Sequence, residues 1–259
     1  MVDIIDAGDG PLVVLLHSSV SGARQWRKLM DVLAPRFQVR AVNLFGYGRT
    51  AAWPDDRLQS LEDQASLVLE AIPDGAPVML VGHSFGGTVA MKTAALLGAR
   101  ATRLALLEPN PFYLLRDAGR TEAFAESWQV RCWIKEFGTK GDWASAAEKF
   151  ADYWQGVGAW NATPSDRRTA FTEAIKPNFH EWDAVMNEAT TLKAWATVLP
   201  QETCIFYDPN TVRPIREIVD LLKHVCGHWT FRMIEAGGHM APLTRPDLVN
   251  PLVAAFLSS

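Results

Sequence analysis

Ser84 lies in a Gly-x-Ser-x-Gly run, residues 82–86, whose surroundings favour a serine that acts as a nucleophile. The apolar residues 77–81 predict a buried strand before it, and residues 88–97 predict a helix after it. Such a sharp turn needs a glycine at each end of the run, because a Cβ atom there would clash. Ser84 would then lie at a helix N-terminus, where the N–H of Phe85 can bind a developing oxyanion. The pattern predicts nucleophilic attack on a carbonyl group, and an inert serine in a tight turn is the alternative.

Strand and helix patterns alternate on both sides of this turn. The expected strands are short apolar runs, at 12–16, 38–44, 77–83, 103–107, 203–207 and 230–235. The expected helices lie at 26–33, 58–72, 85–97 and 214–225, with one more after Pro246. Continuous apolar strands that alternate with helices are typical of a parallel sheet buried on both faces. The sequence therefore predicts an α/β fold with a mostly parallel central sheet and helices on both faces.

Residues 109–199 interrupt this alternation, because they contain helical patterns and no buried strand. We expect an all-helical cap there, inserted between a first core segment, 1–108, and a second one, 200–259. The cap would hold seven of the ten tryptophans: Trp128, Trp133, Trp143, Trp154, Trp160, Trp182 and Trp195. These rings either pack the cap itself or line an apolar pocket above Ser84.

Composition excludes several functional classes. The 259 residues carry a net charge of -4 and contain no basic run, so nothing indicates binding to nucleic acid. No apolar stretch approaches 18 residues, and residues 1–6 lack the features of a signal peptide, so we expect no membrane partner and a cytoplasmic location. Three widely spaced cysteines argue against disulfides and a cysteine-based zinc site. We expect a small-molecule substrate. The sequence leaves open whether the protein forms a homo-oligomer.

The serine turn, the alternation of strands and helices and three further motifs make the chain resemble the α/β-hydrolase superfamily, in particular its capped serine-hydrolase members. Residues 15–19 correspond to the family's His-Gly-x segment, with Ser18 in place of the glycine. The resemblance implies that the N–H of Ser19 is the second oxyanion donor, and it makes His17 a structural residue. Residues 43–50 resemble the family's Asp-x-x-Gly-x-Gly-x-Ser turn, which we also interpret as structural.

The resemblance also indicates the general base and the acid. The Gly-Gly-His run that ends at His239 follows the last predicted strand and is similar to the family's catalytic histidine loop. The usual position of the acid falls on Asn210, an amide, and Asp208 lies two residues earlier. Some capped members carry the acid at the end of the preceding core strand, where this chain has Glu108. We therefore predict Glu108 as the acid, with Asp208 as the alternative.

The implied reaction is acyl transfer. His239 would deprotonate Ser84, which would attack a small apolar or aromatic carbonyl substrate, and Glu108 would orient the imidazole. Ester, lactone and carbon–carbon bond hydrolysis all fit, and the resemblance implies no metal or organic cofactor. A serine nucleophile argues against epoxide hydrolases and haloalkane dehalogenases, which use aspartate. The alternative function is a ligand-binding receptor of the same fold with little turnover.

Overall fold

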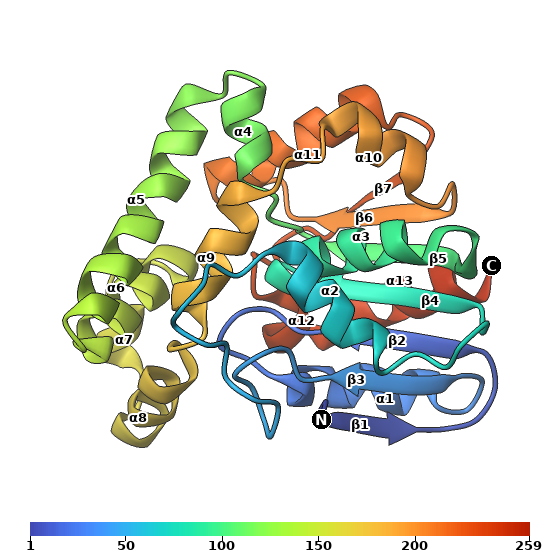
Figure 1. Cartoon of the computed structure of the whole chain (residues 1–259), viewed down its shortest axis with the longest axis horizontal. Helices are drawn as coiled ribbons and strands as arrows, with labels where there is room; N and C mark the ends of the chain where they lie inside the picture. The colour runs from blue at the N-terminus through green and yellow to red at the C-terminus, as the bar shows by residue number, and fades with distance from the viewer.

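Seven strands form one sheet in the computed structural model, which describes residues 1–259 (Figure 1). Their order across the sheet is β1-β3-β2-β4-β5-β6-β7. β1 pairs antiparallel with β3, and every other neighbouring pair is parallel. The strands are β1 (Ile4–Ala7), β2 (Leu12–Leu16), β3 (Gln38–Val42), β4 (Val78–His83), β5 (Ala101–Leu107), β6 (Thr203–Tyr207) and β7 (Thr230–Met233). The predicted α/β fold with a mostly parallel sheet is confirmed.

Helices cover both faces of the sheet because successive strand side chains point to opposite sides. Val13 and Leu15 of β2 belong to one apolar cluster, whereas Val14 and Leu16 belong to the other. The first cluster includes residues of α1 (Arg27–Leu33) and α13 (Pro246–Ser258). The second includes residues of α2 (Leu61–Leu69), α3 (Phe85–Leu97) and α11 (Arg213–Val225). Both faces of the central strands are therefore shielded from water, as their apolar sequences require.

Only helices and loops connect β5 to β6. They are α4 (Tyr113–Asp117), α5 (Thr121–Thr139), α6 (Trp143–Gln155), α7 (Ala159–Ala162), α8 (Ser165–Ala174), α9 (Asn178–Asn187) and α10 (Leu192–Val198). Helices α5 to α9 lie beyond the carboxyl ends of the parallel strands, whereas α10 packs on α11 and α3 (Figure 1). Cap and sheet residues share one apolar cluster of 49 buried residues, which includes Trp154, Trp160, Trp182 and Trp195. Trp143 and Trp160 also pack edge-on against the cap residues Phe179 and Phe171, so part of the tryptophan set packs the cap itself.

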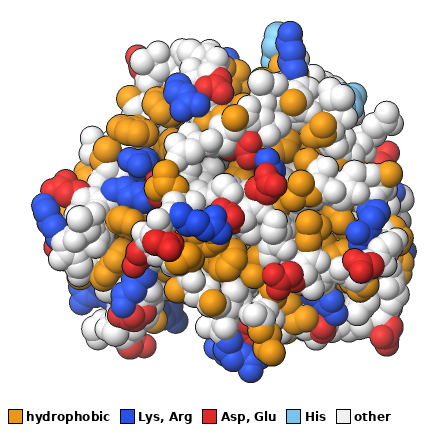
Figure 2. Space-filling view, viewed as in Figure 1, with side chains coloured by type: hydrophobic (Ala, Val, Ile, Leu, Met, Phe, Trp, Pro, Cys, Tyr) orange, Lys and Arg blue, Asp and Glu red, His pale blue; other side chains and the backbone are white.

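The remaining elements are short: a 3-10 turn at Ala23–Trp26, another at Gly98–Arg100, and α12 (Ala241–Thr244). None of the helices is both long and apolar enough to cross a membrane. Basic and acidic side chains are interspersed over the face seen in Figure 2. The three cysteines are unpaired thiols.

One strand was not predicted, and several element boundaries differ from the predicted ones. β3 ends at residue 42 instead of 44, β5 begins at 101 instead of 103, and β7 ends at 233 instead of 235. β1 was not anticipated, because it is a four-residue edge strand whose residues are mostly only half-buried. α2 begins at residue 61 instead of 58, because Ser60 caps it. The Ser60 hydroxyl accepts the N–H of Asp63, and the Asp63 carboxylate accepts the N–H of Ser60, which is a capping box.

We predict that Gly86→Ala destabilises the protein strongly. A Cβ atom at Gly86 would lie 2.3 Å from the carbonyl oxygen of His17 and 2.4 Å from that of Leu16. Both are backbone atoms of the neighbouring strand end, so relief requires helix α3 to move away from the sheet. Overpacking of this kind lowers the free energy of unfolding by about 1–3 kcal/mol. Urea denaturation measures the loss.

Gly227→Ala is the matched control. Its nearest neighbour would be the carbonyl oxygen of Lys223 at 3.6 Å, an ordinary contact distance. We expect its unfolding free energy to stay within about 0.5 kcal/mol of the wild-type value. Equal stability of the two variants would contradict the packing argument at Gly86.

Candidate active site

Ser84 occupies the turn between β4 and α3 in a strained backbone conformation, with φ 53° and ψ -118°. Residues other than glycine rarely adopt a positive φ, so the surrounding packing must impose it. Gly82 and Gly86 approach each other so closely that a Cβ on Gly82 would lie 2.3 Å from the carbonyl oxygen of Gly86. The N–H of Ser84 also donates to the carbonyl of Leu107 at 2.9 Å. The turn is therefore fixed from both sides.

The side chains of Ser84, His239 and Glu108 form a continuous chain of contacts. His239 Nε2 lies 3.0 Å from Ser84 Oγ, and His239 Nδ1 lies 2.6 Å from Glu108 Oε2. All three residues are buried. An Nδ1–H that donates to the carboxylate leaves Nε2 as the acceptor for the serine hydroxyl. The arrangement can remove the proton from Ser84 and stabilise the imidazolium that forms.

Glu108 follows β5 directly and has a positive φ of 45°. Its carboxylate accepts the N–H of Asp208 at 2.7 Å and the hydroxyl of Thr211 at 2.9 Å, in addition to the bond from His239. These donors come from the loop after β6, so that loop holds the Glu108 side chain against the imidazole. Of the two carboxyl groups proposed from the sequence, the structure brings Glu108 to His239.

Asp208 has a different set of partners. Its carboxylate accepts the N–H groups of Asn210 and Gly238, each at 2.7 Å. It thereby joins the loop after β6 to the loop that carries His239, and it does not bond to the imidazole. The strained Ala236, with φ 57°, lies at the start of this histidine loop. Asp208 therefore fixes the backbone that presents His239.

The two expected oxyanion donors line one cavity with Ser84. Phe85 is the first residue of α3, so its N–H has no intrahelical carbonyl to bond. The N–H of Ser19, in the loop after β2, has no protein acceptor. The next residue, Val20, has a positive φ of 66°, and its N–H donates to the hydroxyl oxygen of Tyr47 at 2.9 Å. The loop thus has a fixed conformation in which the amide of Ser19 stays free.

Gln25 and His83 form a hydrogen-bonded link that sequence reasoning missed. Gln25 Oε1 accepts both the N–H and the hydroxyl of Ser18, at 3.1 and 2.8 Å. Gln25 Nε2 donates to His83 Nδ1 at 3.1 Å, and His83 Nε2 donates to the carbonyl of His239 at 2.8 Å. Burial keeps the pKa of His83 well below its ordinary value, so the ring is neutral as this pattern requires. The link connects the two loops that flank Ser84, and it uses the serine that replaces the family's glycine.

His17 and Asn43 make the structural contacts expected of them. His17 Nδ1 donates to the carbonyl of Ser18 at 2.8 Å, and its Nε2 accepts the N–H of Leu44 at 3.1 Å. Burial lowers the pKa of His17 to about 4, so the ring is neutral at physiological pH. Asn43 Oδ1 accepts the N–H of Ala23 at 2.8 Å. Both residues brace loops and lie outside the cavity at Ser84.

The cavity beside Ser84 measures about 10 Å³, which is room for about one water molecule. Cap residues close it: Phe150 and Trp154 from α6, and Trp182 and Val185 from α9. The Trp154 ring stacks on the His239 imidazole, with centroids 4.1 Å apart and an interplanar angle of 23°. Two of the seven cap tryptophans therefore form the wall of the site, and a substrate enters only when the cap side chains move.

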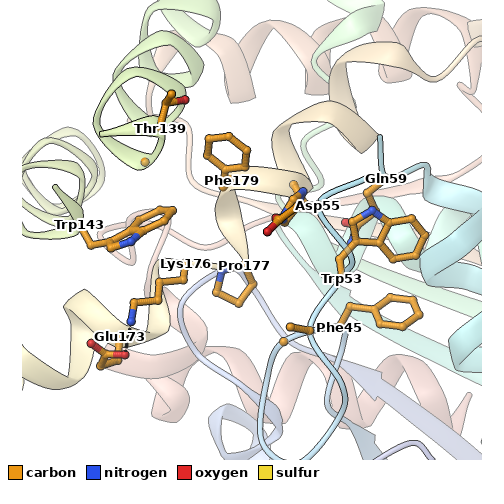
Figure 3. Close-up of a pocket in the computed structure, with 14 residues that line it drawn as sticks. Phe45, Trp53, Asp55, Gln59, Thr139, Trp143, Glu173, Lys176, Pro177 and Phe179 are labelled. Carbon is orange, nitrogen blue, oxygen red and sulfur yellow. Dashed lines mark hydrogen bonds and ion pairs between the residues drawn. The ribbon is translucent and has the colours of Figure 1, made fainter. Parts of the chain in front are cut away.

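A larger cavity of about 730 Å³ lies between the cap and the loop after β3 (Figure 3). Trp143 and Phe179 line it from the cap, and Phe45 and Trp53 line it from that loop. The space-filling view shows a notch between the cap and the core on this face (Figure 2). His180 also lines the larger cavity, where its Nε2 lies 3.1 Å from Asp55 Oδ1. It is not among the residues that line the cavity at Ser84.

Helix α9 separates the two cavities. Phe179 and His180 line the larger cavity, whereas Asn178, Glu181 and Trp182 line the cavity at Ser84. This division follows the helical repeat, in which residues three and four apart share a face. No group of three or more His, Cys, Asp or Glu side chains is arranged to hold a metal ion.

Comparison with known proteins gives relatives of two kinds. A pimeloyl-[acyl-carrier protein] methyl ester esterase of Photobacterium profundum is 34% identical over 113 residues, 44% of this chain and 42% of that protein. The chain thus aligns with less than half the length of the curated esterases that it matches. An (E)-2-((N-methylformamido)methylene)succinate hydrolase of Acinetobacter baylyi is 26% identical over 98% of this chain and 93% of the relative.

Solved structures match the whole fold. The enol-lactonase of Burkholderia xenovorans superposes with a TM-score of 0.76 over 100% of this chain and 96% of that protein, at 15% identity. A hydrolase of Pseudomonas aeruginosa gives a TM-score of 0.75 at 19% identity, over 100% and 94% of the two chains. At such identities the likeness extends to the fold alone.

The family model described as "Alpha/beta hydrolase family" matches residues 13–252, which include the strained serine turn, the strand-end glutamate and the histidine loop. With that match over nearly the whole chain and the sheet order described above, this protein belongs to the alpha/beta hydrolase family.

Proposed function

We propose that the protein is a serine hydrolase that acts through an acyl-enzyme and needs no cofactor. The observation that carries this proposal is the contact chain from Ser84 through His239 to Glu108. The esterase and hydrolase names of the relatives support it independently, because those names describe hydrolytic reactions.

In the proposed mechanism, His239 Nε2 takes the proton of Ser84 while Oγ attacks the substrate carbonyl. The developing oxyanion accepts the free N–H groups of Phe85 and Ser19. Glu108 stabilises the imidazolium, which then protonates the leaving group. Water, activated by His239, hydrolyses the acyl-enzyme and restores Ser84.

The proposed substrate is a small apolar or aromatic carbonyl compound, an ester, a lactone or a compound cleaved at a carbon–carbon bond. The aromatic and aliphatic wall from α6 and α9 supports this class, since an apolar pocket binds apolar groups by excluding water. The relatives named methyl ester esterases support esters as the first substrates to test.

We predict that Ser84→Ala lowers kcat for p-nitrophenyl butyrate by about 10⁴-fold or more while the fold is retained. The physical reason is the loss of the attacking oxygen. A fluorophosphonate should label the wild-type protein at Ser84 and leave the variant unlabelled. Labelling without turnover would favour the ligand-binding receptor. A variant that keeps a tenth of wild-type turnover would refute the nucleophile.

We predict that Glu108→Gln lowers kcat by about 10³–10⁴-fold, because an amide cannot offset the imidazolium charge and favours the wrong tautomer of His239. Asp208→Asn is the matched control, since it alters a carboxylate that contacts the loop backbone and not the imidazole. We expect it to lower thermal stability and to reduce kcat far less. A larger loss of kcat in Asp208→Asn would reverse the assignment of the acid.

We predict that Trp154→Ala shifts the preferred acyl length toward longer esters, because the indole closes the cavity above His239. The measurement is kcat/KM for acetate, butyrate and hexanoate esters, where each added methylene is worth roughly 1–3 kcal/mol when the pocket accepts it. Trp143→Ala removes a cap indole from the larger cavity and should leave the acyl profile unchanged. Identical profiles for both variants would argue against a cap wall that contacts substrate.

A further inference from the structure

Glu181 is a buried carboxylate that lines the cavity at Ser84 and has no part in the proposed mechanism. Only 1% of its surface is exposed. Its Oε1 accepts the hydroxyl of Tyr47 at 2.8 Å, and its Oε2 accepts Asn178 Nδ2 at 2.8 Å and the hydroxyl of Ser19. All three partners donate, which is the pattern of an ionised carboxylate. Burial raises the pKa of Glu181, and the hydrogen bonds from Ser19, Asn178 and Tyr47 oppose that rise because they stabilise the charged form.

The partners confirm this direction of bonding. The hydroxyl oxygen of Tyr47 accepts the N–H of Val20, so its own proton is directed to Glu181. Burial and the Glu181 charge raise the pKa of Tyr47 well above its usual value, so the phenol keeps that proton. Asn178 Oδ1 accepts the indole N–H of Trp182 at 2.8 Å, which fixes its amide group as the donor to Glu181.

No cation balances this carboxylate. Glu181 takes part in no ion pair, and it is the only charged side chain that lines the cavity at Ser84. Two basic residues of α5, Arg131 and Lys135, pair with Asp183 of α9 instead, with nitrogen–oxygen distances of 3.4 and 2.6 Å. An unpaired buried charge is costly unless further donors reach it.

A carboxylate can accept about four hydrogen bonds, and Glu181 accepts three. The unused acceptor site is on Oε1, which accepts only from Tyr47. Glu181 also bonds to the side chain of Ser19, the residue whose N–H is the proposed oxyanion donor. An anion at this position opposes negative charge that a substrate brings into the same cavity.

We propose that Glu181 is a specificity-determining residue, which selects carbonyl substrates that carry a hydrogen-bond donor, an ammonium or hydroxyl group, and rejects those that carry a carboxylate. The donor would occupy the free acceptor site of Oε1 and complete the coordination of the carboxylate. This inference rests on the proposed function, because it assigns the substrate of the same site.

A purely structural role makes a different prediction. If Glu181 only ties Ser19 and Tyr47 to the cap, its replacement lowers activity toward every substrate by the same factor. If Glu181 selects the substrate, its replacement lowers activity toward donor-bearing substrates and raises activity toward anionic ones. The opposite signs distinguish the two roles.

The experiment compares kcat/KM for two series of esters on the wild-type protein and Glu181→Gln. One series has phenyl acetates with a meta aminomethyl, hydroxymethyl, ethyl or carboxylate group, and the other has phenyl benzoates with these groups on the acyl ring. The ratio of wild type to variant cancels the intrinsic reactivity of each ester. In at least one series, we expect Glu181→Gln to weaken the aminomethyl ester at least tenfold relative to the ethyl ester and to improve the carboxylate ester several-fold.

Two further variants serve as controls. Glu173→Gln removes a charge from the exposed side of the cap, at the edge of the larger cavity, and should leave all ratios unchanged. Glu181→Asp keeps the charge and should keep the order of preference. Ratios in Glu181→Gln that stay within twofold of wild type in both series would overturn the proposal.

A binding measurement separates this inference from the proposed reaction. In a Ser84→Ala background, calorimetry gives Kd for benzylamine, benzyl alcohol and benzoate with Glu or Gln at position 181. We expect benzylamine to bind the Glu form at least tenfold more tightly than benzoate does, and the Gln form to lose that preference. If Ser84 proves unreactive while the preference persists, the proposed function fails and the selectivity stands. Equal binding of amine and carboxylate to the Glu form would refute the selectivity by itself.

Discussion

The close approach of α3 to the ends of β2 and β4 is the constraint on which the site depends. Because Gly82 and Gly86 have no Cβ atom, the backbones of the strand ends and of α3 approach to distances at which a side chain would clash. These contacts hold Ser84 at a positive φ. The same approach places the start of α3 beside the loop after β2, so the free amides of Phe85 and Ser19 reach one cavity. All four non-glycine residues with positive φ, Val20, Ser84, Glu108 and Ala236, lie in loops that build this site. Strain is thus concentrated where the surrounding packing can impose it.

A parallel sheet explains why residues so distant in the sequence meet. Loops at the carboxyl ends of β5, β6 and β7 carry Glu108, Asp208 and His239, and these strands are neighbours in the sheet. Each loop stabilises the next: the Asp208 N–H orients the Glu108 carboxylate, and the Asp208 carboxylate holds the turn before His239. A carboxylate at the end of β5 therefore leaves the loop after β6 free for a structural role, in which the backbone N–H of Asn210 donates to Asp208.

Local patterns predicted most of the core. The bounds of α3 and β6 agree with those expected from the sequence, because buried apolar runs and terminal glycines or prolines identify such elements. The motif around Ser84 is a local property and indicated that residue, whereas the resemblance to the α/β-hydrolase superfamily indicated His239 and Glu108. It did not indicate Gln25 or Glu181, because their roles come from contacts across 58 and 162 residues. Nor did it reveal that α9 faces two cavities, since both of its sides carry aromatic residues.

The two buried carboxylates near Ser84 differ in what balances them. Glu108 accepts from His239, so a positive charge that the imidazole acquires in the proposed reaction would lie 2.6 Å from a carboxylate oxygen. Glu181 accepts hydrogen bonds from neutral donors only. The cationic side chains of Arg131 and Lys135 pair with Asp183, which lies on another face of helix α9. Hydrogen bonds from neutral groups stabilise a buried anion without removing its field. The field of Glu181 acts on the cavity at Ser84, so the cap contributes electrostatic selection of the substrate in addition to an apolar wall. Both contributions come from the turn of α9 that carries Glu181, Trp182 and Val185.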